Sequence, residues 1–139
     1  MIKKFLYVFV LFFLSANLFA KSEFLKEGID LYNKNKFEDA KFKFEQDIVF
    51  NPKSEMSYLY LSKIFQNLDK KDLEEQNLNT VILLNPKNEE AIYSLAKLKL
   101  KNSDFQKSKE LNKKLGDLCT KFCEKSLKLK KEIENLSKK

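Results

Sequence analysis

The sequence contains no histidine, no arginine and no tryptophan among its 139 residues. Histidine is the usual general base and the commonest metal ligand, so its absence argues against an enzyme and against a metal site. The lack of arginine removes the side chain that makes bidentate contacts to bases. With only Gly28 and Gly116, the chain cannot form a glycine-rich phosphate loop. We therefore predict no catalytic residue, no cofactor, no metal and no nucleic-acid partner.

Cysteine is also scarce, since Cys119 and Cys123 are the only two. Four residues apart on one helix, their Cβ atoms would lie ~5–6 Å from each other. A disulfide needs ~3.5–4.5 Å between these atoms, so a bridge would strain or unwind that turn. Two thiolates alone also cannot complete a tetrahedral zinc site. The favoured interpretation is that both side chains pack beside Phe122. The alternative, in an exported protein, is oxidation, including a bridge to another chain.

Long apolar runs are absent except at the N-terminus. Lys3 and Lys4 precede an apolar run over residues 5–14, and small residues follow up to Ala20. This order predicts a signal peptide over 1–20 and export to the periplasm or cell envelope. An uncleaved anchor that tethers the protein to the inner membrane is the alternative. The apolar stretch is, however, shorter than the ~20 residues that span a bilayer as a helix.

Proline occurs twice, in the triplets Asn-Pro-Lys at 51–53 and 85–87, which lie 34 residues apart. Before the first triplet, Phe37, Ala40 and Phe44 follow one another at spacings of three and four, which predicts one face of a helix. Proline cannot continue a helix, so each triplet marks a helix end. A fixed period of this size indicates stacked helix pairs.

Local signals divide the chain into pairs of helices. Asn35 with Glu38, and Ser103 with Gln106, have the spacing of capping boxes. Gly116 is a natural helix stop. We predict helices at about 22–34, 36–50, 55–68, 70–84, 89–101 and 104–115, and a last helix from Asp117 to about Leu136.

Gly28, Phe37, Ala40, Phe44 and Pro52 together resemble a tetratricopeptide repeat over 21–54. The segment 55–88 is similar, although its second helix has a glutamate, Glu74, where the pattern has a small residue. The segment 89–116 is a degenerate third copy. The resemblance implies an all-α, tetratricopeptide-type helix-turn-helix solenoid of about three repeats, closed by a C-terminal capping helix over 117–139. An ordinary helical bundle is the alternative, and it would also be all-α.

The resemblance implies that the first helix of each repeat lines a concave groove, which binds a peptide or helix of another protein. This would make the chain a non-enzymatic adaptor or scaffold. Leu25 and Ile29 stand where repeat proteins that clamp a terminal carboxylate have Lys and Asn, so an apolar or amphipathic partner is expected instead. Some groove residues could be covered by the chain itself. The predicted groove residues are Leu25, Ile29, Tyr32, Leu59, Lys63, Gln66, Tyr93, Lys97 and Lys101.

Charge is distributed unevenly along the chain. Residues 101–139 contain 12 lysines and 6 acidic residues, whereas residues 21–100 contain 13 lysines and 14 acidic residues. A lysine-rich C-terminal helix could hold a peripheral protein on anionic lipid. Attachment to a membrane surface is therefore the alternative to protein binding.

Overall fold

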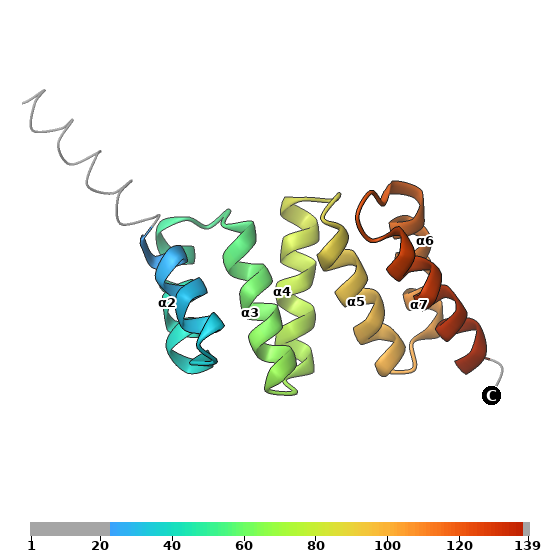
Figure 1. The fold of residues 1–139 in the computed structure, drawn as a ribbon, viewed down its shortest axis with the longest axis horizontal. Coiled ribbons are helices and arrows are strands. Elements are labelled where there is room, and N and C mark those ends of the chain that lie inside the picture. The colour runs from blue at the N-terminus through green and yellow to red at the C-terminus, as the bar shows by residue number, and fades with distance from the viewer. Residues whose placement is uncertain (1–22, 138–139) are drawn as a thin grey trace, which may run out of the picture. The chain divides into compact units, whose positions relative to one another are not determined.

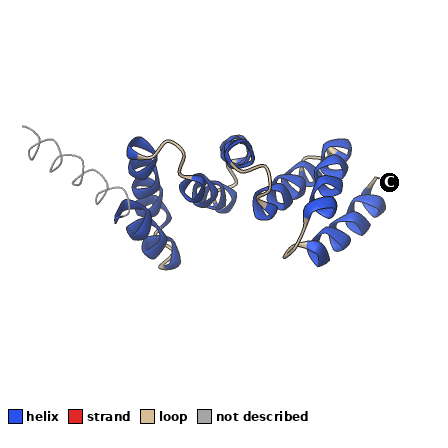
Figure 2. Ribbon diagram, turned by 90° about the horizontal axis from the view of Figure 1, so that it is seen from above, coloured by secondary structure: helices blue, strands red, loops and turns tan. Residues whose placement is uncertain are grey.

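The computed structural model describes residues 23–137, and within this range it contains helices and no strand (Figures 1 and 2). The predicted signal segment 1–20 lies outside the described residues. The predicted all-α fold is confirmed. No helix in the described range is long and apolar enough to cross a membrane. Residues 23–33 are helical, and the helices that follow are α2 (Phe37–Phe50), α3 (Glu55–Asn67), α4 (Lys71–Leu84), α5 (Glu89–Lys101), α6 (Phe105–Leu118) and α7 (Cys123–Leu136).

The helices start with the period that the proline triplets predict. The helices α2, α4 and α6 begin at residues 37, 71 and 105, which are 34 residues apart. The helices α3, α5 and α7 begin at residues 55, 89 and 123, with the same spacing. The period therefore extends into α7, which begins where the first helix of a fourth unit would begin.

The turns within the helix pairs repeat in the same way. Asn35, Asp69 and Ser103 have φ angles of 58°, 51° and 62°, so each is left-handed. In the first turn, the Lys36 N–H donates to the Leu31 carbonyl at 3.0 Å, which is the long hydrogen bond of a Schellman motif. Asn and Asp tolerate the left-handed conformation better than most residues. These residues therefore end the first helix of each pair.

This geometry corrects the predicted caps. Asn35 and Ser103 are left-handed turn residues and do not cap the helices that follow them. The residue before α2 is Lys36, which makes no side-chain capping bond. The cap of α6 is Asp104, whose carboxylate accepts from the Lys107 N–H at 3.0 Å.

The chain divides into two compact units, Met1–Tyr60 and Leu61–Lys139. In the first unit the core forms around Phe44, which is fully buried, stacks on Tyr60 and lies against Gly28. A Cβ atom at Gly28 would lie only 2.7 Å from Phe44 Cε1. The close helix approach expected at Gly28 is therefore present.

The same unit contains a buried carboxylate, Asp47. Its Oδ2 accepts a hydrogen bond from the Ser57 hydroxyl, which in turn accepts from Ser54 at 3.0 Å. The hydroxyls therefore satisfy one oxygen of this buried acid.

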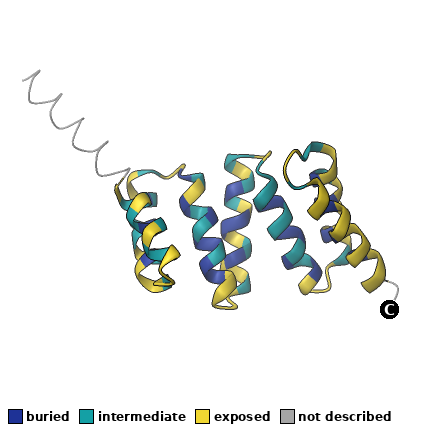
Figure 3. Ribbon diagram, viewed as in Figure 1, coloured by how far each residue is buried: buried dark blue, intermediate teal, exposed yellow. Residues whose placement is uncertain are grey.

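In the second unit α6 packs against both α5 and α7. Ala96 of α5 is fully buried, and its carbonyl accepts from the Ser108 hydroxyl of α6 at 2.8 Å. Much of α7 is exposed in Figure 3, and its buried positions are Ser126, Leu129 and Ile133. The small residue at Ala96 thus allows the two helices of this pair to approach closely.

The C-terminal segment differs from its prediction. Gly116 does not stop α6, which continues to Leu118, and α7 begins only at Cys123. Residues 119–122 are not helical. The two cysteines therefore flank a turn instead of sharing one helical face, and they form a disulfide with Cα atoms 5.2 Å apart. The favoured prediction of two free thiols is wrong, because the chain unwinds where an intact helix would hold the sulfurs apart.

Candidate functional site

A hollow of about 300 Å³ lies in the second unit, where the end of α3 meets α4, α5 and α7. We call it the α3–α5–α7 hollow. Three of the predicted groove residues, Gln66, Lys97 and Lys101, line it. The remaining lining residues are Glu74, Leu98, Leu100, Glu132 and Leu136.

Glu74 places a carboxylate in the lining of this hollow. Its side chain belongs to α4, and the residue is 4% exposed. The Gln66 amide donates a hydrogen bond to Glu74 Oε1 at 3.1 Å. Burial raises the pKa of the Glu74 carboxyl, and the hydrogen bond and the charge of Lys101 oppose that rise. The hollow therefore contains an acidic group that is largely removed from water.

The lysines predicted to attract acidic groups have partners within the chain. Lys97 pairs with Glu132 of α7 at 3.2 Å. Lys101 pairs with Asp69 at 2.9 Å and holds the pKa of that carboxyl below its usual value. Lys63 pairs with Glu90 at 2.8 Å. Their charges are thus compensated locally, and they offer less attraction for an acidic partner than their number suggests.

Tyr93 is partly covered by the C-terminal segment. The Phe122 ring meets the Tyr93 ring at a centroid distance of 5.7 Å. The Lys125 ammonium lies 4.0 Å from the Phe122 centroid and 5.5 Å from the Tyr93 centroid. The chain therefore covers part of this predicted groove residue itself.

Glu89 holds this covering segment in place. Its Oε1 accepts from the Thr120 N–H and hydroxyl, at 2.8 and 2.7 Å. Its Oε2 accepts from the N–H groups of Lys121 and Phe122, at 2.9 and 2.7 Å. These bonds, that of the Thr120 hydroxyl foremost, lower the pKa of Glu89 to about 2. One carboxylate at the start of α5 thus binds the whole turn that the disulfide closes.

Known structures resemble this arrangement, although no family model and no curated protein matches the sequence. The Yersinia enterocolitica type III secretion chaperone SycD, in complex with a peptide of the translocator YopD, is 18% identical with a TM-score of 0.75. The match covers 85% of this chain and 94% of that one. The tetratricopeptide repeat domain of Arabidopsis OM64 is 18% identical with a TM-score of 0.73, over 84% and 98%.

A third similar structure is the TPR2B domain of yeast Sti1 in its complex with pHsp70. It is 13% identical with a TM-score of 0.78, and the match covers 85% of this chain and 98% of that domain. The fold is the tetratricopeptide repeat fold. The predicted resemblance is confirmed at the level of the fold. The first helices of the three repeats are residues 23–33, α3 and α5, and α7 begins in register with them.

The first compact unit, Met1–Tyr60, contains the other predicted groove residues. Leu25 and Ile29 are partly exposed. Tyr32 is also partly exposed, and its ring contacts those of Phe37 and Tyr60 at centroid distances of 5.5 and 5.1 Å. These three side chains remain candidates for binding.

Leu59 is a different case, because its side chain is only 3% exposed. Buried residues occur around much of α3, among them Ser57, Leu61 and Ile64. Leu59 is therefore a core residue in this structure, whereas the sequence analysis predicted it as a groove contact.

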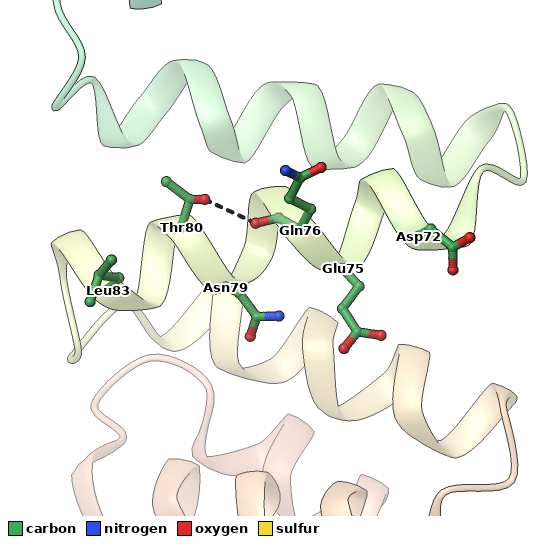
Figure 4. Close-up of a pocket in the computed structure, with 6 residues that line it drawn as sticks. All are labelled: Asp72, Glu75, Gln76, Asn79, Thr80 and Leu83. Carbon is green, nitrogen blue, oxygen red and sulfur yellow. Dashed lines mark hydrogen bonds between the residues drawn. The ribbon is translucent and has the colours of Figure 1, made fainter.

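The outer face of α4 has a shallow hollow of another kind (Figure 4). Its lining residues all come from this one helix and are Asp72, Glu75, Gln76, Asn79, Thr80 and Leu83. No second element encloses the hollow, so we use this face as a control surface below. The described residues contain no group of three His, Cys, Asp or Glu side chains that could hold a metal ion.

Glu74, Glu89 and Glu132 are site residues that the sequence analysis did not predict. A signal exists for Glu74, because it stands 34 residues after Ala40 and replaces a small buried residue of the repeat with an acid. Glu89 and Glu132 carry no such signal. Their partners lie 31 or more residues away, so only the packing of α7 reveals them.

Proposed function

We propose that this protein is a non-enzymatic interaction module that binds a segment of another protein at the α3–α5–α7 hollow of its second unit. The observation that carries the proposal is the α3–α5–α7 hollow. It combines the predicted groove residues Gln66, Lys97 and Lys101 with a buried acid, Glu74. Residues of α3, α4, α5 and α7 line the hollow, so a bound segment would contact several helices at once.

Proteins of the same fold support this mode of binding. SycD is described with a peptide of YopD, and the first tetratricopeptide domain of RPAP3 is described with the HSP90 peptide SRMEEVD. An interaction role also agrees with the sequence, which lacks histidine as a general base.

The chemistry of the hollow indicates what the partner presents. Leu136 is partly open and offers an apolar contact. Lys97 and Lys101 already have acidic partners, whereas the Glu74 carboxylate accepts a hydrogen bond from the Gln66 amide and forms no ion pair within 4 Å among the described residues. A buried carboxylate gains most from a cationic or hydrogen-bonding group. We therefore expect an amphipathic segment that carries a basic or donor side chain toward Glu74.

We further propose that the protein works outside the cytoplasm, in the periplasm or cell envelope. The proposal rests on the signal-like segment 1–20, which lies outside the described residues. The Cys119–Cys123 disulfide supports it, because such bonds persist mainly in oxidising compartments.

Site-specific photocrosslinking in cells of the source organism tests the binding face. The crosslinker replaces Gln66 in the hollow, and the matched control places it at Gln76 on the outer face of α4. A second position in the hollow, Leu136, guards against an effect of losing the Gln66–Glu74 bond. We expect one common adduct from Gln66 and Leu136 that is absent from Gln76.

The partner identified from the adduct is then purified in free form, and its affinity is measured for the wild type and for a Glu74→Gln variant. Removing the negative charge of Glu74 should weaken binding if the partner places a cation there. Equal adducts at all three positions would show that another surface binds the partner. Full affinity of the Glu74→Gln variant would show that the partner places no cation at Glu74.

A further inference from the structure

The helix α7 has a face that no described helix covers. The helices α5 and α7 begin 34 residues apart, so they occupy equivalent places in successive units. In the third repeat α6 packs on α5, and the Ser108 hydroxyl of α6 donates a hydrogen bond to the Ala96 carbonyl. The described residues include no second helix to pack on α7 in the same way. Within residues 23–137, α7 thus has no helix packed on it as α6 packs on α5.

A groove of about 490 Å³ marks this place, between α6 and α7. We call it the α6–α7 groove. Leu127 lies in its lining and is 63% exposed. Asn112 lines it as well and is 6% exposed, with its amide nitrogen donating to the Ser126 carbonyl at 3.1 Å. Asn112 Oδ1 is buried and has no hydrogen-bond partner within the described residues.

Both features indicate a missing partner. A buried acceptor without a donor is destabilising, so a donor at this point would stabilise whatever fills the groove. An exposed leucine beside it offers apolar area to the same ligand. A ligand with both a hydrogen-bond donor and an apolar side chain would therefore fit the groove.

The charged residues of the groove indicate which charge its partner carries. Lys109, Lys113 and Lys130 line it, and none of them forms an ion pair with a described residue. Asp117 and Glu134 also line it, so the lysines are in excess. Lys130 stands 34 residues after Ala96, at the point where α5 has a small residue against α6. A helix packed there would face an ammonium group and would need a carboxylate.

We propose that the α6–α7 groove binds an acidic amphipathic helix of a partner protein, which takes the place of the second helix of a fourth unit. Its apolar side covers Leu127, its acidic side faces Lys130, Lys109 and Lys113, and one of its side chains donates to Asn112 Oδ1. This surface is separate from the α3–α5–α7 hollow, so either proposal can fail without the other.

Two other occupants fit less well. A flat lipid surface cannot enter the groove to reach the buried Asn112 oxygen in its lining. A second copy that docks through the same face would bring Lys109, Lys113 and Lys130 against identical lysines. The acidic helix is the occupant that satisfies shape, hydrogen bond and charge together.

The test uses two synthetic helical peptides of about four turns each, with the same leucine face and the same asparagine. One carries glutamate on its flanks and the other lysine. Fluorescence anisotropy measures the binding of each to the full chain, to Lys130→Glu and to Lys131→Glu. Lys131 is the matched control, because it is the next residue on the exposed helix and does not line the groove. Circular dichroism confirms that the variants stay folded.

We expect the acidic peptide to bind the wild type and the lysine peptide not to bind it. Lys130→Glu should weaken the binding of the acidic peptide about tenfold, and Lys131→Glu should weaken it by less than about twofold. Of these two lysines, only Lys130 lines the groove. Equal effects of the two variants, or equal binding of the two peptides, would overturn the proposal. Binding to vesicles of phosphatidylglycerol and of phosphatidylcholine is measured in the same way. If the protein binds only the phosphatidylglycerol vesicles and neither peptide, the groove is a membrane surface and the proposal is wrong.

Discussion

The two glycines of this protein should respond in opposite directions to the same substitution. Both lie in helices, where alanine is favoured over glycine by about 0.8–1 kcal/mol. At Gly28 the added Cβ would lie 2.7, 2.9 and 3.0 Å from three carbons of the Phe44 ring. At Gly116 its nearest neighbour would be Ser126 Oγ at 3.5 Å, which is an ordinary contact. Only the first site is overpacked.

The size of the effect follows from how far Phe44 can move. Its side chain is fully buried and stacks on Tyr60 at a centroid distance of 5.0 Å, so the ring has little room to retreat. Overpacking a core typically costs about 1–3 kcal/mol. Subtracting the helix gain leaves a net loss of up to about 2 kcal/mol for Gly28→Ala. Gly116→Ala keeps the gain and should stabilise the protein by about 0.5–1 kcal/mol.

Urea and thermal unfolding followed by circular dichroism measure both variants. Each kcal/mol should shift the Tm by roughly 4 °C for a chain of this size, so the two Tm values should differ clearly. The double variant Gly28→Ala with Phe44→Leu should lose less stability than the sum of its single changes, because the smaller side chain gives way. A Gly28→Ala protein as stable as Gly116→Ala would refute the assigned helix contact.

Three further predictions concern Glu89, the buried alanines and the N-terminus. Glu89→Gln should remove part of the acid sensitivity of folding. The folded pKa of Glu89 is about 2 against an ordinary value of 4.5, so its contribution is present above pH 4.5 and is lost as the pH falls toward 2. A pH series of urea unfolding curves for both proteins checks this. Ala40→Leu and Ala96→Leu should each lower the Tm by overpacking fully buried positions, whereas Lys41→Leu should not. Mass spectrometry of the native protein should find a mature N-terminus at or near Lys21, and an intact Met1 in the membrane fraction would establish the anchor instead.

The helices could be predicted from the sequence because the period and the small residues are local signals. Pro52 and Pro86 end the second helices where predicted, and Gly28 and Ala96 mark the close contacts. The turns were less predictable. Left-handed residues such as Asn35 end the preceding helix, and the same residue types also cap a following helix. The sequence alone does not distinguish these two uses.

The site was predictable only in part, since its contacts join distant residues. Gln66, Lys97 and Lys101 were placed by the repeat pattern, and the structure brings them to one hollow. The ion pairs that compensate the lysines involve acids on other helices, which no local pattern connects. The burial of Leu59 was not predicted, because the pattern gives the face of a helix but not how much of that helix its neighbours enclose.

The C-terminal helix shows how chemistry can replace hydrophobic area at the end of a repeat stack. The buried residues of α7 include only two large apolar side chains, Leu129 and Ile133. Its start is instead held by a disulfide and by the four hydrogen bonds that Glu89 accepts. These contacts hold the turn that precedes α7, whereas Leu127 on the helix itself stays 63% exposed. The same arrangement that anchors α7 against Tyr93 therefore leaves the α6–α7 groove open for a partner helix.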